Sequence, residues 1–412
     1  MIKKFVIISF LLKEVYEWFL TYIDIKGADR ALPDNVKDVY NEEEFNKWKA
    51  YNKENIKLEI VEDITSKILS FCLIAFNLYA FIFYFFQVND YLKYLCLIVT
   101  VTFLETLISV PFDYYDTFVI EEKYGMNKST RLTFVLDLIK SLVIGIVLSF
   151  IFISIIKYLY DRFGNNGAIL IIIVTIGIAL LLAVCIMQIL KIFNKFTPLE
   201  EGELKDKLIA LCKKYDIEVK KIVVKDASRR TTRANAFCTG LGKKKTISLD
   251  DNLVKDYTID QIVAVFAHEF AHAKYKHTIK TLPFGILKTV FMLIIFIALL
   301  NFESVSLSFG FHERNYMIAQ LVLVFITWPI DILLDYIGNS LSRKHEYEAD
   351  AFAAREGYGE MLISALKKLN KESLSDINPH PLIVKLTYSH PTLSERITAI
   401  KNIDKKIQEL NL

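Results

Sequence analysis

The sequence has no strong excess of positive or negative charge. Its 50 Lys and Arg residues against 47 Asp and Glu residues give a formal net charge of +3 over 412 residues. A net charge this small predicts no basic field of the kind that nucleic-acid binding uses. Cysteine is also scarce and no C-x-x-C pair occurs, so a disulfide framework is not predicted. The five cysteines are Cys72, Cys96, Cys185, Cys212 and Cys238.

Long apolar runs, in contrast, are abundant. Hydrophobic residues make up 53% of the chain, and several runs reach the roughly 20 residues that cross a bilayer. Residues 5–22 are interrupted by Lys13, Glu14 and Glu17, but no small-residue cleavage site follows, so we interpret them as an uncleaved first span. We predict seven spans, at residues 5–22, 68–89, 94–112, 141–156, 168–190, 281–302 and 315–336.

The positions of Lys and Arg predict the orientation of these spans. The loop 24–63 alone contains seven Lys or Arg residues, whereas the segments on the opposite side contain few, among them Lys93 and Arg314. Basic loops stay on the cytoplasmic side of a membrane. The chain is therefore predicted to be a multi-pass protein of a bacterial inner membrane or an endoplasmic reticulum, with its N-terminus outside or lumenal and its C-terminus cytoplasmic.

Two soluble segments alternate with the apolar runs. Residues 220–226 are predicted to form a strand and residues 234–251 a hairpin, because two β-prone runs flank a Gly-Leu-Gly turn. Residues 258–280 return to a helical pattern. The predicted organisation is five spans with inner loops 24–63 and 113–132 in residues 1–193, a first soluble part at 194–280, two spans at 281–337 and a second soluble part at 338–412.

The motif HEFAH, residues 268–272, is the clearest sign of chemistry. Residues four apart share one face of a helix, so His268 and His272 can both offer ring nitrogens to one zinc ion. Glu269 is rotated by about 100° from His268, which suits a general base for an attacking water. A surface helix with incidental histidines is the alternative.

A catalytic zinc site needs a third protein ligand, and residues 342–357 supply a candidate. Glu346 and Asp350 are again four apart, so Glu346 can reach the metal while Asp350 accepts the free N–H of a ligating histidine. His277 lies five residues beyond His272. We interpret it as a polar surface residue, because a continuous helix would displace it from the ligand face.

An ordered set of motifs along nearly the whole chain resembles the type I CAAX prenyl proteases, membrane zinc metallopeptidases of the M48 family. Besides HEFAH, the set comprises VPFDYYDTFVIEEKYGMNKST (110–130), FNKFTPLEEGELK (193–205), NAFCTG (235–240), SRKHEYEADAFA (342–353) and YSHPTLSERI (388–397). The resemblance implies a mainly α-helical polytopic protein. Its seven transmembrane helices would enclose a water-filled chamber beside a gluzincin-like protease domain with a small β-hairpin.

The resemblance also implies roles for individual residues. One Zn²⁺ per chain would be held by three ligands, and one glutamate would act as the base, one aspartate would support a histidine ligand, and one histidine would stabilise the oxyanion. On the sequence alone, His390-Pro391 fits a turn equally well, and Arg396 fits a structural salt bridge near the site. The resemblance assigns the zinc ligands to His268, His272 and Glu346, and the base to Glu269. It assigns the support of a histidine ligand to Asp350 and the oxyanion contact to His390. It also places Asn235 and Ala236 in an edge strand that pairs with the substrate.

Three functions compete at this point. The first is an endoprotease of the CAAX type that cuts peptides or proteins near the C-terminus, with or without a prenyl group. The second is a quality-control protease for misfolded or translocon-jammed membrane proteins, and the third is a transporter or receptor with structural zinc. The expected partners are the substrate and the lipid bilayer, without nucleic acid, and the chain is expected to act as a monomer.

Overall fold

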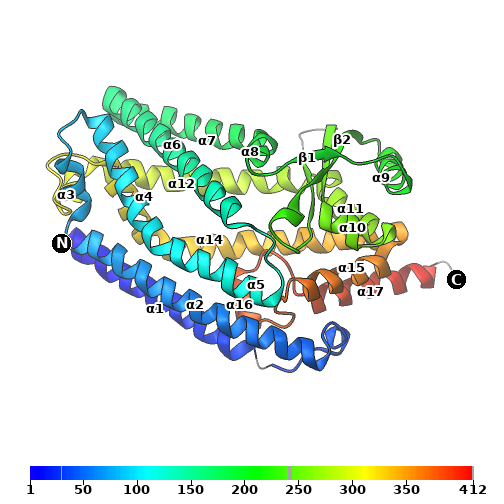
Figure 1. Cartoon of the computed structure of the whole chain (residues 1–412). Coiled ribbons are helices and arrows are strands. Elements are labelled where there is room, and N and C mark those ends of the chain that lie inside the picture. Colours follow the sequence, from blue (N-terminus) through cyan, green and yellow to red (C-terminus); the bar gives the residue numbers. More distant parts are fainter. Residues whose placement is uncertain (29, 240–243, 411–412) are drawn as a thin grey trace.

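The computed structural model describes residues 1–28, 30–239 and 244–410. It is mainly helical, with long helices running along the molecule and a small sheet at one end (Figure 1). The N-terminus lies at the end opposite the sheet, and the C-terminal helix lies at the same end as the sheet. The long helices and α3 are α1 (Ile2–Gly27), α2 (Glu42–Ala75), α3 (Leu78–Phe85), α4 (Asp90–Tyr115), α6 (Arg131–Phe163), α7 (Ala168–Val184), α12 (His277–Asn301) and α14 (Tyr316–Ala353).

Shorter elements complete the sheet end and the connections between the long helices. The sheet has the order β1-β2-β4-β3, with β2 and β4 parallel and the two outer pairs antiparallel. The elements are α5 (Glu122–Tyr124), α8 (Ile186–Phe193), β1 (Phe196–Pro198), α9 (Glu203–Lys214), β2 (Glu218–Lys225), β3 (Ala236–Thr239), β4 (Lys244–Asp250), α10 (Asp251–Asp256), α11 (Ile259–Lys274), α13 (Glu303–Leu307), α15 (Gly359–Glu372), α16 (Pro381–Thr387) and α17 (Leu393–Leu410).

The predicted strand and hairpin are confirmed. The strand expected at 220–226 is β2, and the hairpin expected at 234–251 is the antiparallel pair of β3 and β4. Its predicted Gly-Leu-Gly turn lies in residues 240–243, outside the described residues. The helical pattern expected at 258–280 is confirmed but divided between two helices, because α11 ends at Lys274 and α12 begins at His277. The break falls at Lys276, whose backbone is left-handed with φ 58° and ψ 38°.

Within the described residues, four helical segments are long and apolar enough to cross a membrane: Asp90–Tyr124, Arg131–Val184, His277–Asn301 and Tyr316–Glu372. A fifth span results if Glu42–Ala75 and Leu78–Phe85, which are bent by 70°, form one span. The membrane character of the chain is therefore confirmed, and the count of seven stays a prediction.

Two features account for the difference between seven spans and this count. Arg131–Val184 contains two of the predicted spans, α6 and α7, joined by a turn at Gly164–Gly167. A Cβ atom on Gly167 would lie 2.9 Å from the Leu159 carbonyl oxygen. The turn therefore approaches the end of α6 so closely that only glycine fits at this position. The predicted first span does form a helix, α1, but its charged residues lower its hydropathy.

The buried apolar residues form two separate clusters. One lies at the sheet end and includes Leu249, Phe266 and Phe352. The other lies at the opposite end and includes Phe83 and Leu97. Within the described residues, four long helices each have an interval without a residue in either cluster: 11–27 in α1, 59–68 in α2, 105–115 in α4 and 327–348 in α14.

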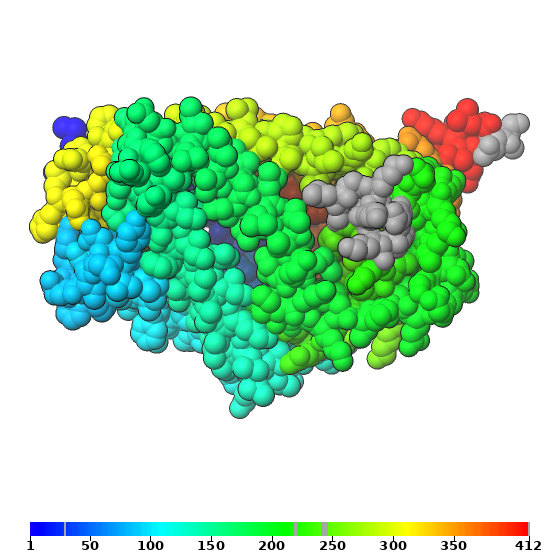
Figure 2. Space-filling view, turned by 90° about the horizontal axis from the view of Figure 1, so that it is seen from above, coloured from blue at the N-terminus to red at the C-terminus, as the bar shows by residue number. Residues whose placement is uncertain are grey.

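The surface is hollowed over this central region. Seen from above, deeper atoms of the N-terminal segment are visible in blue through an opening within the α6–α8 stretch, and deeper atoms of the C-terminal part are visible in brown-red between this stretch and α12 (Figure 2). Charged residues lie at the same level of the helices: Lys288 of α12 pairs with Asp335 at 2.6 Å and Asp331 at 3.3 Å. A tightly packed apolar interior would not accommodate these groups.

Candidate metal centre

Helix α11 carries the HEFAH motif and is fixed at its start by a capping box. The Thr258 side chain accepts a hydrogen bond from the Gln261 N–H at 3.3 Å, and the Gln261 side chain accepts one from the Thr258 N–H at 3.1 Å. Val263, Phe266 and Phe270 are buried in the sheet-end cluster. Because one face of α11 is held in the core and the helix contacts α14, the motif is placed rigidly against residues far along the chain.

His268, His272 and Glu346 converge, with ligand atoms within 4.8 Å of one another. Nε2 of His268 lies 3.3 Å from Nε2 of His272 and 3.3 Å from Oε2 of Glu346, and Nε2 of His272 lies 3.3 Å from Oε1 of Glu346. Ligands placed tetrahedrally about 2.0–2.1 Å from a zinc ion are roughly 3.3–3.4 Å apart. The three distances therefore fit one zinc ion with a fourth position left open.

An unsatisfied buried atom supports the same fit. Oε2 of Glu346 is buried and has no hydrogen-bond partner among the described residues. A buried carboxylate oxygen without a partner is costly in free energy, and a bound cation would supply the missing interaction.

Asp350 and Arg396 lie behind His268. Oδ1 of Asp350 is 2.8 Å from Nδ1 of His268, the ring nitrogen that faces away from the metal group. Arg396 makes a bidentate contact with the same carboxylate, donating from Nε to Oδ2 at 2.9 Å and from Nη2 to Oδ1 at 2.7 Å. Asp350 is fully buried, so the bidentate contact with Arg396 compensates a negative charge that burial alone would disfavour.

The pKa values of the α11 side chains differ because their neighbours differ. Burial and the Arg396 guanidinium lower the pKa of His268, but the hydrogen bond and charge of Asp350 outweigh them and raise it to about 9. Burial and the neighbouring His268 lower the pKa of His272 to about 4. Burial raises the pKa of Glu269, which brings this carboxyl nearer the range that suits a general base.

The remaining predicted residues lie around this group. His390 is exposed, and its Nε2 lies 3.5 Å from Oε1 of Glu346. Ala236 begins β3, which is an edge strand and contacts α11. Asn235 precedes β3, and its carbonyl accepts a hydrogen bond from the Asp250 N–H at 2.9 Å.

One predicted placement is wrong: His277 is not a surface residue. It is only 3% exposed, and its Nδ1 lies 3.0 Å from Nδ1 of His272. It also joins His345 and Glu348 in a second group with ligand atoms within 4.8 Å of one another. The spacing argument failed because the left-handed Lys276 breaks the helix and turns His277 back toward His272.

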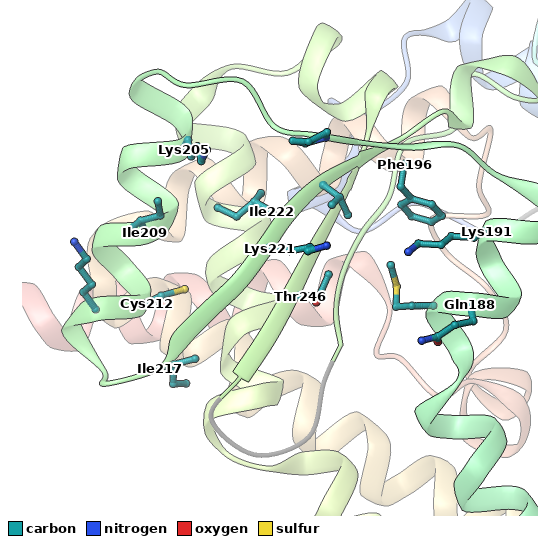
Figure 3. A pocket seen from close by; sticks show the side chains of 14 residues that line it. Gln188, Lys191, Phe196, Lys205, Ile209, Cys212, Ile217, Lys221, Ile222 and Thr246 are labelled. Atoms are coloured by element: carbon teal, nitrogen blue, oxygen red, sulfur yellow. The ribbon is translucent and has the colours of Figure 1, made fainter.

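A cavity of about 750 Å³ lies apart from the metal group, between α8, α9 and the strands (Figure 3). Phe196, Ile209 and Ile222 line it together with Lys191 and Lys221. Of its lining residues in the described chain, none belongs to the His268–His272–Glu346 group. The chemistry is therefore centred elsewhere.

Comparisons with known proteins agree with this arrangement. The family model described as CAAX prenyl protease N-terminal, five membrane helices, matches residues 22–195, and that of peptidase family M48 matches residues 198–404. CAAX prenyl protease 1 of Saccharomyces cerevisiae is 31% identical over 423 residues, covering 95% of this chain and 93% of the relative. The Arabidopsis thaliana homolog is 30% identical over 416 residues, covering 94% and 95%.

A solved structure has the same fold. The crystal structure of S. mikatae Ste24p superposes with a TM-score of 0.91 at 30% sequence identity, covering 97% of this chain and 99% of that one. The fold and the His-His-Glu group thus define a membrane metallopeptidase. More narrowly, the chain belongs to the CAAX prenyl protease 1 family within peptidase family M48, and it is a zinc metalloprotease of the CAAX type.

Proposed function

We propose that this protein cuts near the C-terminus of membrane-delivered substrates that end in a C-a-a-X sequence, and that it accepts them with a prenyl group. The observation that carries the proposal is the set of three 3.3 Å distances among His268, His272 and Glu346, with Glu269 adjacent on the same helix. The names of the relatives, CAAX prenyl protease 1, support this substrate class.

The proposed cofactor is one zinc ion per chain, held by His268, His272 and Glu346. When bound, zinc polarises the scissile carbonyl and lowers the pKa of water. Glu269 takes the proton from the attacking water and returns it to the leaving amine, a transfer that typically contributes about 10²–10⁴-fold. His390, which faces the metal group from its exposed side, donates a hydrogen bond to the carbonyl oxygen as negative charge develops there.

Asp350 and Arg396 act through His268. The Asp350 carboxylate accepts the Nδ1–H of His268, which leaves Nε2 free to bind the metal. Arg396 holds that carboxylate in place through two hydrogen bonds. This arrangement makes Asp350 and Arg396 positioning residues.

The edge strand β3 is the proposed substrate-binding element. One side of β3 pairs with β4, and the edge position leaves the backbone of the other side available to an extended peptide. Asn235 and Ala236 lie where β3 begins. Main-chain pairing of this kind binds peptides with little regard to side chains, which suits a protease that accepts varied C-termini.

For the membrane body we propose seven spans enclosing a hydrated chamber, with the soluble parts 194–280 and 338–412 forming one gluzincin-like protease domain on the cytoplasmic side. The spans would be α1, the bent pair α2 and α3, α4, α6, α7, α12 and α14. The two separate apolar clusters and the central interval between them support a chamber, as do the openings in Figure 2.

The test compares the parent protein with Glu269→Gln on matched C-a-a-X peptides, one farnesylated and one not, in detergent or liposomes. We expect Glu269→Gln to lower kcat by about 10²–10⁴-fold. Glu360→Gln serves as the matched control, since Glu360 is an exposed residue of α15. Equal cleavage by Glu269→Gln would contradict the mechanism. Cleavage of misfolded membrane proteins, but of neither peptide, would favour quality control.

A further inference from the structure

A second polar cluster, of two buried histidines and a partly exposed glutamate, lies directly behind His272. Its members are His277 at the start of α12, and His345 and Glu348 near the end of α14. Nδ1 of His277 is 3.0 Å from Nδ1 of His272, and Nε2 of His277 is 3.1 Å from Oε2 of Glu348. The reaction steps above use none of these three residues.

The distances fix which nitrogen atoms carry protons. Nε2 of His272 faces His268 and Glu346, so this is the atom that binds a metal and carries no proton. A neutral His272 then has its proton on Nδ1, and Nδ1–H donates to Nδ1 of His277. The proton of neutral His277 is on Nε2, and this N–H donates a hydrogen bond to the Glu348 carboxylate. In these two hydrogen bonds, each N–H donor faces an acceptor.

A second metal ion on these residues is the competing interpretation, and the rings argue against it. The imidazoles of His277 and His345 are stacked, with centroids 4.1 Å apart and planes 7° apart. A metal lies in the plane of each imidazole that binds it, along the nitrogen lone pair. Two stacked, nearly parallel rings cannot both direct lone pairs at one ion without turning, and Nδ1 of His277 already contacts His272.

The backbone explains how His277 reaches this position. Lys276 adopts a left-handed conformation between α11 and α12, so α12 does not continue α11, and His277 at its start lies against His272. Helix α12 then packs along α14, the helix that carries Glu346 and Glu348. His277 is therefore held between the ligand helix α11 and a carboxylate of α14.

We propose that His277 is a positioning residue for the zinc ligand His272, and that Glu348 holds His277 in the tautomer that accepts the His272 proton. This inference rests on the proposed function. Each histidine ligand would then be oriented from behind by a carboxylate: directly for His268 through Asp350, and through one intervening imidazole for His272. Loss of such an outer partner typically weakens metal binding by about 10–100-fold.

The experiment measures zinc affinity of the purified full-length protein by competition with a chromogenic chelator, and zinc content by metal analysis. His277→Phe keeps an aromatic ring against His345 but removes the acceptor, and we expect affinity about 10–100-fold lower. His277→Asn places an amide oxygen near the former Nδ1 position, so we expect it to recover part of the loss. His345→Phe is the control, which keeps the stacking and leaves both hydrogen bonds intact.

Cobalt(II) substitution adds a spectroscopic readout. The visible absorption bands depend on how the ligands are oriented around the ion, so we expect them to shift in His277→Phe and to stay near the parent positions in His345→Phe. Folding is checked by the thermal midpoint of the metal-free proteins. If His277→Phe fails to fold, Glu348→Ala decides in its place, because Glu348 is partly exposed; we expect reduced zinc affinity there too.

Unchanged zinc affinity in a folded His277→Phe protein, or in Glu348→Ala, overturns the proposal. Two zinc ions per parent chain, with one lost in His345→Phe, also overturn it in favour of a second metal site. A parent protein that binds no zinc contradicts the proposed function itself. A parent that binds zinc no more tightly than His277→Phe contradicts this inference alone.

Discussion

The two ends of the molecule bury different kinds of polar group. At the sheet end, ionisable side chains such as Asp250, Glu346 and Asp350 are buried within or beside the apolar cluster. At the opposite end, the buried polar residues named for the described chain are neutral, among them Ser306 and Asn315. The sheet end therefore depends on exact pairing of charges, whereas the opposite end depends on packing.

Aromatic contacts hold the opposite end. Phe83 packs edge-on against Tyr94 at 5.0 Å between ring centroids and against Phe311 at 5.6 Å. Edge-on pairs of this kind contribute about 0.5–1.5 kcal/mol beyond the burial of their surface. A substitution there should lower stability without a direct effect on chemistry, and the predictions below test this contrast.

Removal of the metal should give the largest effect, and only at the sheet end. Dialysis against a zinc chelator should lower kcat/KM by about 10³-fold or more, because the charge stabilisation that a metal supplies amounts to several kcal/mol. Activity should return when stoichiometric zinc is added. Full activity in protein shown by metal analysis to be zinc-free would contradict the assignment of the site.

Asp350→Ala should give the next largest effect. It leaves the Arg396 guanidinium buried without its carboxylate, and breaking such a pair costs about 3–5 kcal/mol. We expect a lower thermal midpoint in detergent together with weaker zinc binding. The double variant Asp350→Ala, Arg396→Met is the control, since it removes the stranded charge and should recover stability but not zinc affinity.

Leu97→Ala tests the opposite end. Leu97 is fully buried in that cluster, and its truncation should lower the free energy of unfolding by about 2–5 kcal/mol. Zinc affinity of the folded protein should stay at the parent value. A large change in zinc affinity would show that the two ends are coupled, contrary to the separation of the clusters.

Lys288→Met should give the smallest effect, and it tests the region between the two ends. Lys288 is paired with Asp335 and Asp331, and all three side chains are partly exposed. In a hydrated chamber such a pair contributes less than about 1 kcal/mol. A loss of 3 kcal/mol or more in the thermal unfolding of Lys288→Met, relative to Lys288→Arg, would contradict a hydrated setting.

Regular spacing made much of the metal group predictable from the sequence. His268 and His272 are four residues apart on one helix, as are Glu346 and Asp350 on another, and helical geometry alone places each pair on one face. That these two faces meet was a hypothesis from the need for a third zinc ligand, which the resemblance supported, because no local pattern specifies the packing of α11 on α14. Arg396 likewise could be assigned to Asp350 only once α17 was placed.

Breaks in helices were harder to predict. Asn77 adopts a left-handed conformation between α2 and α3, and asparagine is a residue type that tolerates it. Lys276 does the same between α11 and α12, but lysine gives no such signal. The first break bends the α2–α3 stretch by 70° and the second places His277 against His272, so an analysis based on hydropathy and period predicted neither the bend nor the second cluster.

The proposed pairing of substrates with the edge strand beside α11 limits what the protein can cut. β3 has one backbone side left to pair, and it lies next to the helix that carries the metal group. Only a stretch of chain that is already unfolded can adopt the strand geometry needed there. We therefore expect substrates with a longer unstructured tail between the last folded domain and the C-terminus to be cleaved faster.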